Sequence, residues 1–158
     1  MTTMIPSFER GVLGAIREGV AAEPVREWPE PSLQLGLDLL RRIRESAAGM
    51  RQALESELAN GVEGRSFVRI YGPLLPVAVD HVAVVRTLVE SLAAAQDPPS
   101  KSLLAELLLL EHENKAFRDL LVDALSRASQ PRGPVDWQRV HAAEEALARG
   151  EVKPFSRQ

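Results

Sequence analysis

Histidines and nearby carboxylates are the residues of this chain with the clearest chemical potential. His81 lies in an apolar stretch, where a histidine must find a hydrogen-bond partner or stay neutral. His141 is followed three and four residues later by Glu144 and Glu145, a spacing that places them on one helical face. If both histidines and one of these carboxylates converge, they form an internal site for a metal ion or a small ligand. The alternative for His81 is a core histidine satisfied by hydrogen bonds.

Sequence signatures of helical metal sites are missing. No glutamate stands three residues before a histidine, as in di-iron carboxylate bundles, and no His-x-x-x-His pair occurs. Glu111 and Glu113 flank His112, but neighbours two apart on a helix project from different faces, so they do not chelate together. We therefore expect no cofactor or metal and keep the site near His81 and His141 as an alternative.

Other catalytic chemistry also lacks a signature. The absence of cysteine excludes thiolate sites, disulfides and cysteine nucleophiles. There is no glycine-rich phosphate loop, and the segment 64–68 (GRSFV) lacks the final glycine of a nucleophile elbow. Arg41, Arg42 and Arg44 form a small basic cluster with acids beside it, more typical of a solvated face than of a nucleic-acid patch. These patterns favour a non-catalytic protein that does not bind nucleic acid.

Asn114 interrupts a regular apolar seam. The residues of this seam recur in alternating steps of four and three: Leu103, Leu107, Leu110, Asn114, Phe117, Leu121, Ala124 and Ala128. A single asparagine in such a seam can fix register and partner number by pairing with a polar group on another helix. That helix belongs either to a second copy or partner, which makes Asn114 a candidate contact, or to the same chain.

Helical periodicity recurs along the chain, and no segment shows sustained strand alternation. The pattern predicts three long helices at about 32–60, 66–95 and 100–129, with shorter helices near the N- and C-termini. Long helices joined by short connections favour an antiparallel bundle. We therefore predict a single all-α helical domain over residues 1–158.

Prolines and glycines mark the breaks between these helices. Residues 22–31 form a proline-rich linker, and Pro73 and Pro76 should kink or divide the third helix near Gly72. Asn60-Gly61 is a helix stop, because glycine accepts the left-handed conformation beyond a helix end. Residues 150–158 are predicted to be a mobile tail.

Composition is that of a folded chain: 45% of residues are apolar, 26% are charged and the net charge is −3. No apolar run reaches the roughly 18 residues of a membrane span, and the N-terminus lacks the basic start of a signal peptide. We expect a cytoplasmic protein that does not contact the membrane.

Aromatic residues are few, and three stand outside the long helical stripes. Trp28, Trp137 and Phe155 are candidate partner contacts, because large aromatic side chains dominate interface energetics. They are equally suited to ordinary packing roles within the chain.

The C-terminal stretch 143–158 (AEEALARGEVKPFSRQ) is similar to the C-terminal ends of some small bacterial antitoxins. The resemblance implies a helix, a glycine turn and a short tail that lie against a partner. Antitoxins usually begin with a DNA-binding fold, and the first half of this chain shows no such signal. We expect a bundle that mediates protein–protein interaction or self-association; the alternatives are the ligand or metal site near His81 and His141, and an antitoxin-like or regulatory partner.

Overall fold

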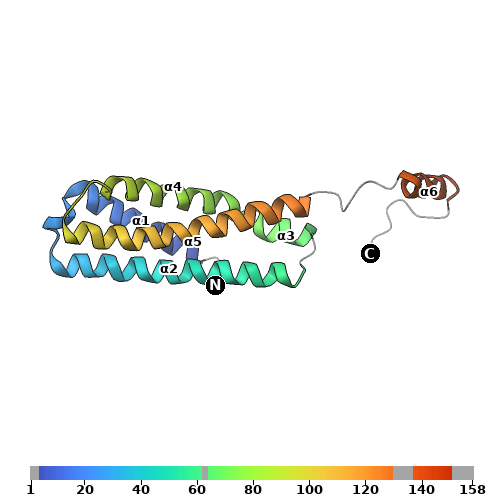
Figure 1. Ribbon diagram of the computed structural model, residues 1–158. Coiled ribbons are helices and arrows are strands. Elements are labelled where there is room, and N and C mark those ends of the chain that lie inside the picture. The colour runs from blue at the N-terminus through green and yellow to red at the C-terminus, as the bar shows by residue number, and fades with distance from the viewer. Residues whose placement is uncertain (1–3, 62–63, 130–136, 151–158) are drawn as a thin grey trace.

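Helices account for all the regular structure in the part of the chain that the computed structural model describes, residues 4–61, 64–129 and 137–150 (Figure 1). The elements in order are α1 (Met4–Ala22), a 3-10 turn η1 (Val25–Glu27), α2 (Glu30–Ala59), α3 (Gly64–Tyr71), α4 (Leu74–Leu92), α5 (Pro98–Ser129) and α6 (Trp137–Ala148). The predicted all-α fold with long helices packed together is confirmed.

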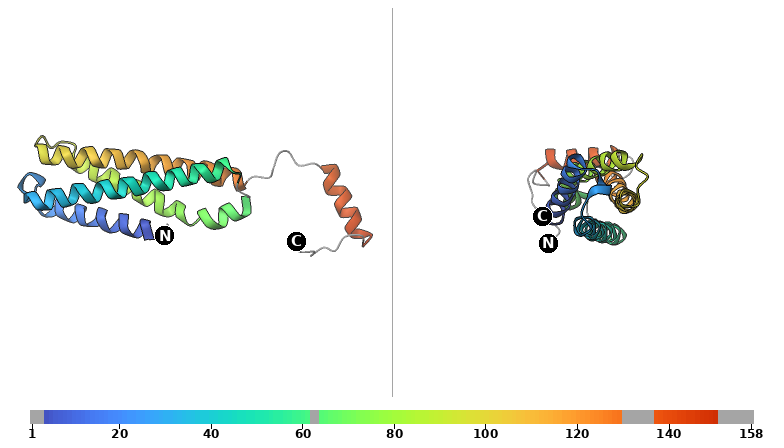
Figure 2. Two further views of the ribbon diagram at one scale, coloured as in Figure 1. Left: turned by 90° about the horizontal axis from the view of Figure 1, so that it is seen from below. Right: turned by 90° about the vertical axis from the view of Figure 1, so that its left-hand side faces the viewer.

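α5 packs against more elements of the bundle than any other helix. It packs along α2 and α4 and also against α3, whereas α1 packs against α2 and α4. The end-on view in Figure 2 places α1 and α5 on opposite sides of the bundle. One core cluster joins α1, α2, α4 and the first half of α5, and a second joins the far half of the bundle to α3.

The predicted third helix is divided into α3 and α4. The Gly72 N–H donates to the carbonyl of Val68 at 2.8 Å, and the Leu75 N–H donates to the carbonyl of Gly72 at 3.1 Å. A Cβ atom on Gly72 would lie 2.5 Å from the Val68 carbonyl oxygen, so the tight turn requires glycine. Pro73 and Pro76 cannot donate backbone hydrogen bonds, which favours the same break.

The helix ends follow local chemistry. Gly61 follows α2 with φ of 73°, as the Asn60-Gly61 stop signal predicts. Asp97 precedes α5, and its Oδ2 accepts the Ser100 N–H at 3.0 Å. That backbone hydrogen bond holds the pKa of the Asp97 carboxyl below its ordinary value. α5 begins at Pro98, which suits the first turn of a helix because proline has no backbone N–H that would need a hydrogen-bond partner there.

The connection between α1 and α2 is more ordered than a linker over 22–31 implies. α1 continues through Ala22, η1 follows, and α2 begins at Glu30. Trp28 closes this turn: its Nε1–H donates to the Glu23 carbonyl at 3.1 Å. Its ring lies so close to Gly19 that a Cβ there would be 3.0 Å from Cζ2.

α6 stands apart from the bundle in Figure 1. Gly150 follows it with φ of 74°, and the rest of the predicted tail lies outside the described residues. Across the described ranges, no helix combines the length and apolar character that crossing a membrane requires.

Candidate functional site

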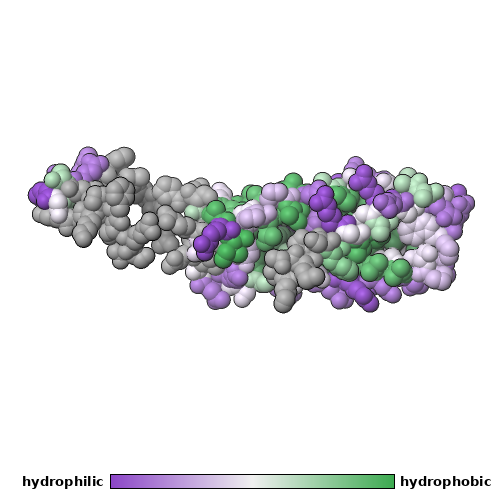
Figure 3. Space-filling model, turned by 180° about the vertical axis from the view of Figure 1, so that it is seen from behind, coloured by the Kyte–Doolittle hydropathy of each residue, from purple (hydrophilic) through white to green (hydrophobic). Residues whose placement is uncertain are grey.

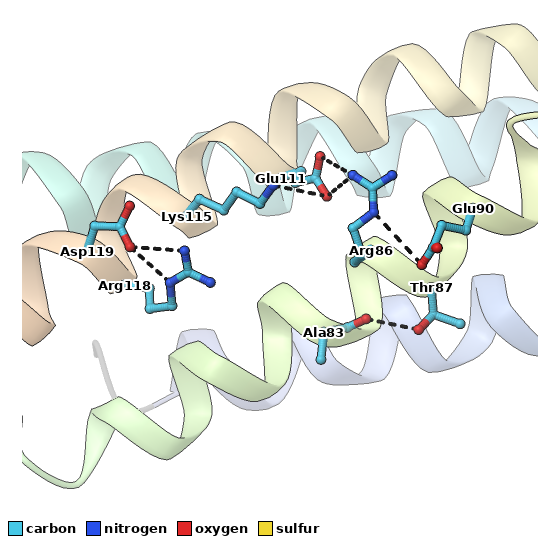
Figure 4. Close-up of polar contacts among 8 residues, drawn as sticks. All are labelled: Ala83, Arg86, Thr87, Glu90, Glu111, Lys115, Arg118 and Asp119. Atoms are coloured by element: carbon cyan, nitrogen blue, oxygen red, sulfur yellow. Dashed lines mark hydrogen bonds and ion pairs between the residues drawn. The ribbon is translucent and has the colours of Figure 1, made fainter.

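The acids that follow the apolar start of α5 connect neighbouring helices. Glu111 is buried beside α4, where Arg86 Nη1 lies 3.1 Å from its Oε2, and Lys115 adds a contact at 3.8 Å (Figure 4). Glu113 faces α2 and accepts from Arg51 Nε at 2.7 Å. The two carboxylates therefore point to different helices and do not form a chelating pair, as the sequence predicted.

His81 and Glu9 form a buried pair that connects α4 to α1. His81 Nδ1 lies 2.5 Å from Glu9 Oε2, and the two side chains are only 7% and 6% exposed. An imidazole nitrogen and a carboxylate oxygen at this distance are within hydrogen-bonding range. Sequence reasoning missed Glu9, although the signal was present: Glu9 lies on the same helical stripe as Val12, Leu13 and Ile16.

The pair borders a small, partly open space that we call the inner chamber. Its volume is about 30 Å³, enough for a water molecule. Its polar side chains come from Glu9, His81 and Asn114, and the remaining lining is apolar: Ala47, Met50, Leu74, Val77, Ala78 and Phe117. Glu9 Oε1 and Asn114 Nδ2 are buried without a hydrogen-bond partner among the described residues. A single water or hydroxyl group could satisfy both, because it can donate to the Glu9 oxygen and accept from the Asn114 amide nitrogen.

A second space, which we call the outer cleft, also borders His81. It has a volume of about 220 Å³ and is lined by Arg10, Leu13, Gly14, Arg17, Asp80, His81 and Val84. Arg10, Arg17 and Asp80 are exposed. Within the described ranges, neither arginine forms an ion pair.

The residues proposed from sequence as metal ligands do not share one site. His81 is buried, whereas His141 on α6 is 67% exposed and its Nδ1 lies 3.8 Å from Glu144 Oε2. Glu145 is also exposed and lies 3.8 Å from Arg149. The residues described contain no cluster of three or more histidine or acidic side chains able to hold a metal ion.

The candidate partner contacts have different surroundings. Asn114 is 6% exposed and faces the interior of its own chain, together with most of the apolar seam. Trp28 is half-buried and packs against the core. Trp137 is the first residue of α6, and Phe155 lies outside the described residues. An intermolecular role for Asn114 would require the bundle to open.

An apolar depression, which we call the α1–α2 groove, runs beside Trp28. Its volume is about 310 Å³, and small or apolar side chains dominate its lining: Ala15, Ile16, Gly19, Ala22, Glu23, Trp28, Pro29, Ser32, Leu35, Gly36 and Leu39. Leu35 is 60% exposed. Figure 3 views the face that carries α1 and shows apolar side chains at the surface among polar ones.

Comparison of the chain with known protein families, curated proteins and solved structures found no match.

Proposed function

We propose that this protein is a helical-bundle interaction module that self-associates through the α1–α2 groove. The observation that carries the proposal is an exposed leucine, Leu35, beside an open apolar groove of about 310 Å³. Exposed apolar surface of this kind is typical of sites where another protein binds.

A second copy is the occupant that best suits this surface. In a symmetric dimer, the same patch on each subunit must complement itself. Here the protruding side chain and the depression belong to one face, since Leu35 also lines the groove. Leu35 of each copy can enter the groove of the other, whose lining consists mostly of small or apolar residues.

The contribution of Leu35 to the free energy of dimer formation can be estimated from its exposure. Full burial of a leucine side chain contributes about 1.5–3 kcal/mol. Because 60% of Leu35 is exposed, complete burial would contribute roughly 1–2 kcal/mol per copy. Two copies in one interface would then contribute about 2–4 kcal/mol, which corresponds to a factor of roughly 30 to 700 in the dimer dissociation constant.

The test is native mass spectrometry over a protein dilution series, with Leu35→Asp as the variant. We expect a dimer whose dissociation constant rises at least tenfold in Leu35→Asp. Leu109→Asp is the matched control, because Leu109 is a 50% exposed leucine on α5, on the opposite side of the bundle from α1. A wild-type chain that stays monomeric at all concentrations, or equal weakening by both substitutions, would refute the proposal.

A further inference from the structure

We propose that the outer cleft binds a small oxyanion, a carboxylate or a phosphate, between Arg10, Arg17 and His81. The proposal is independent of the α1–α2 groove and of self-association. It rests on two arginines without an ion-pair partner among the described residues, a buried histidine with one nitrogen in contact with Glu9, and the size of the cleft.

The two arginines supply the charge. Arg10 and Arg17 are seven residues apart on α1, about two helical turns, so they lie on the same face. Both line the cleft, and neither has an ion-pair partner in the part of the chain that is described. Asp80 is the one acid in the lining, so the charged side chains of the cleft sum to a positive value. Guanidinium groups are well suited to carboxylate and phosphate because they can donate two parallel hydrogen bonds.

His81 supplies a further polar group at the border of the cleft. Glu9 Oε2 lies 2.5 Å from Nδ1, which leaves Nε2 as the ring nitrogen that Glu9 does not engage. A bound oxyanion can accept a hydrogen bond from Nε2–H while Nδ1 stays in contact with Glu9. The remaining groups around His81 are Arg10, Arg17 and Asp80 on the cleft side and the neutral amide of Asn114 in the inner chamber.

The size of the cleft narrows the ligand class. Its volume of about 220 Å³ exceeds the roughly 30 Å³ that one water occupies in the liquid, so a small anion fits with some of its hydration. It is smaller than the roughly 300–1,000 Å³ of pockets that enclose drug-sized ligands. The cleft therefore suits an isolated carboxylate or phosphate group better than an entire nucleotide.

The experiment is an NMR titration of the full chain with inorganic phosphate and, separately, with acetate. Sodium chloride keeps the ionic strength constant, and the readout is the ring resonances of His81, including the 15N shifts that report the proton on each nitrogen. We expect a saturable shift with at least one anion, and 15N values at saturation that show Nε2 protonated. The anion with the lower dissociation constant identifies the preferred oxyanion.

Two double variants that remove the same charge distinguish binding in the cleft from nonspecific electrostatic attraction of the anion to the protein. Arg10→Gln with Arg17→Gln should weaken binding at least tenfold. Arg42→Gln with Arg69→Gln removes the same charge from two exposed arginines outside the cleft and should change the affinity less than twofold. A shift that does not saturate with either anion, or equal weakening in both double variants, would overturn the proposal. Because all four arginines are exposed, we expect every variant to fold.

Discussion

The buried Glu9–His81 pair gives the sharpest quantitative prediction. Glu9→Ala removes the carboxylate and leaves His81 Nδ1 in the interior without its partner. His81→Ala leaves both oxygens of Glu9 without a donor, because Oε1 already lacks one among the described residues. Each single substitution should therefore lower the free energy of unfolding by more than the interaction energy between the two side chains.

The magnitudes follow from burial. Leaving a buried donor or acceptor without its partner costs about 1–3 kcal/mol, and more where the group is charged. The hydrogen bond is charge-assisted, so the coupling energy between the two substitutions should be about 1.5–3 kcal/mol. Additivity within about 0.3–0.5 kcal/mol is the behaviour of sites that do not interact. The predicted coupling therefore lies well outside the additive range.

The assay is a double-mutant cycle by urea unfolding, followed by circular dichroism, with wild type, Glu9→Ala, His81→Ala and the double variant. The effects of lost packing occur in the single and double variants alike and largely cancel in the cycle. Asp123 and Arg127 provide the control cycle. Arg127 Nη2 lies 2.8 Å from Asp123 Oδ2, and the two side chains are 66% and 65% exposed. An exposed pair should couple by less than about 1 kcal/mol. A Glu9–His81 coupling as small as that of the control would refute the reasoning that burial makes this pair strong.

Three further predictions test local features of the fold. Gly61→Ala should destabilise the fold by about 1–2 kcal/mol, because φ is 73° there; an unchanged urea midpoint would contradict this. Gly72→Ala should cost on the order of 1–3 kcal/mol, since its Cβ would lie 2.5 Å from the Val68 carbonyl oxygen; calorimetry that shows no fall in Tm would rule this out. Burial, followed by the hydrogen bond that Tyr71 donates to Glu57, raises the pKa of Tyr71 to about 12, above the ordinary value of about 10. The stability from this group should be complete below pH 10 and lost as pH rises through about 12, and ultraviolet titration of this single tyrosine should show a lower midpoint in Glu57→Gln.

Sequence periodicity alone determined the fold class. The apolar seam on α5 predicted a long amphipathic helix, and the seam is buried from Leu103 to Ala124. Local signals also determined the helix ends at Asn60-Gly61 and the break near Gly72. These features depend on backbone geometry and on residues a few positions apart, so a linear pattern contains them.

Only the tertiary structure decided which polar residues meet. Glu9 and His81 are 72 positions apart and come together because α1 packs against α4. His81 and His141, the two candidates for one internal site, have different surroundings: His81 is buried and His141 is exposed on α6. The sequence also could not say that Asn114 faces an inner chamber of its own chain. The physical reason is that helical periodicity fixes the face on which a residue lies, whereas the packing of helices fixes what that face contacts.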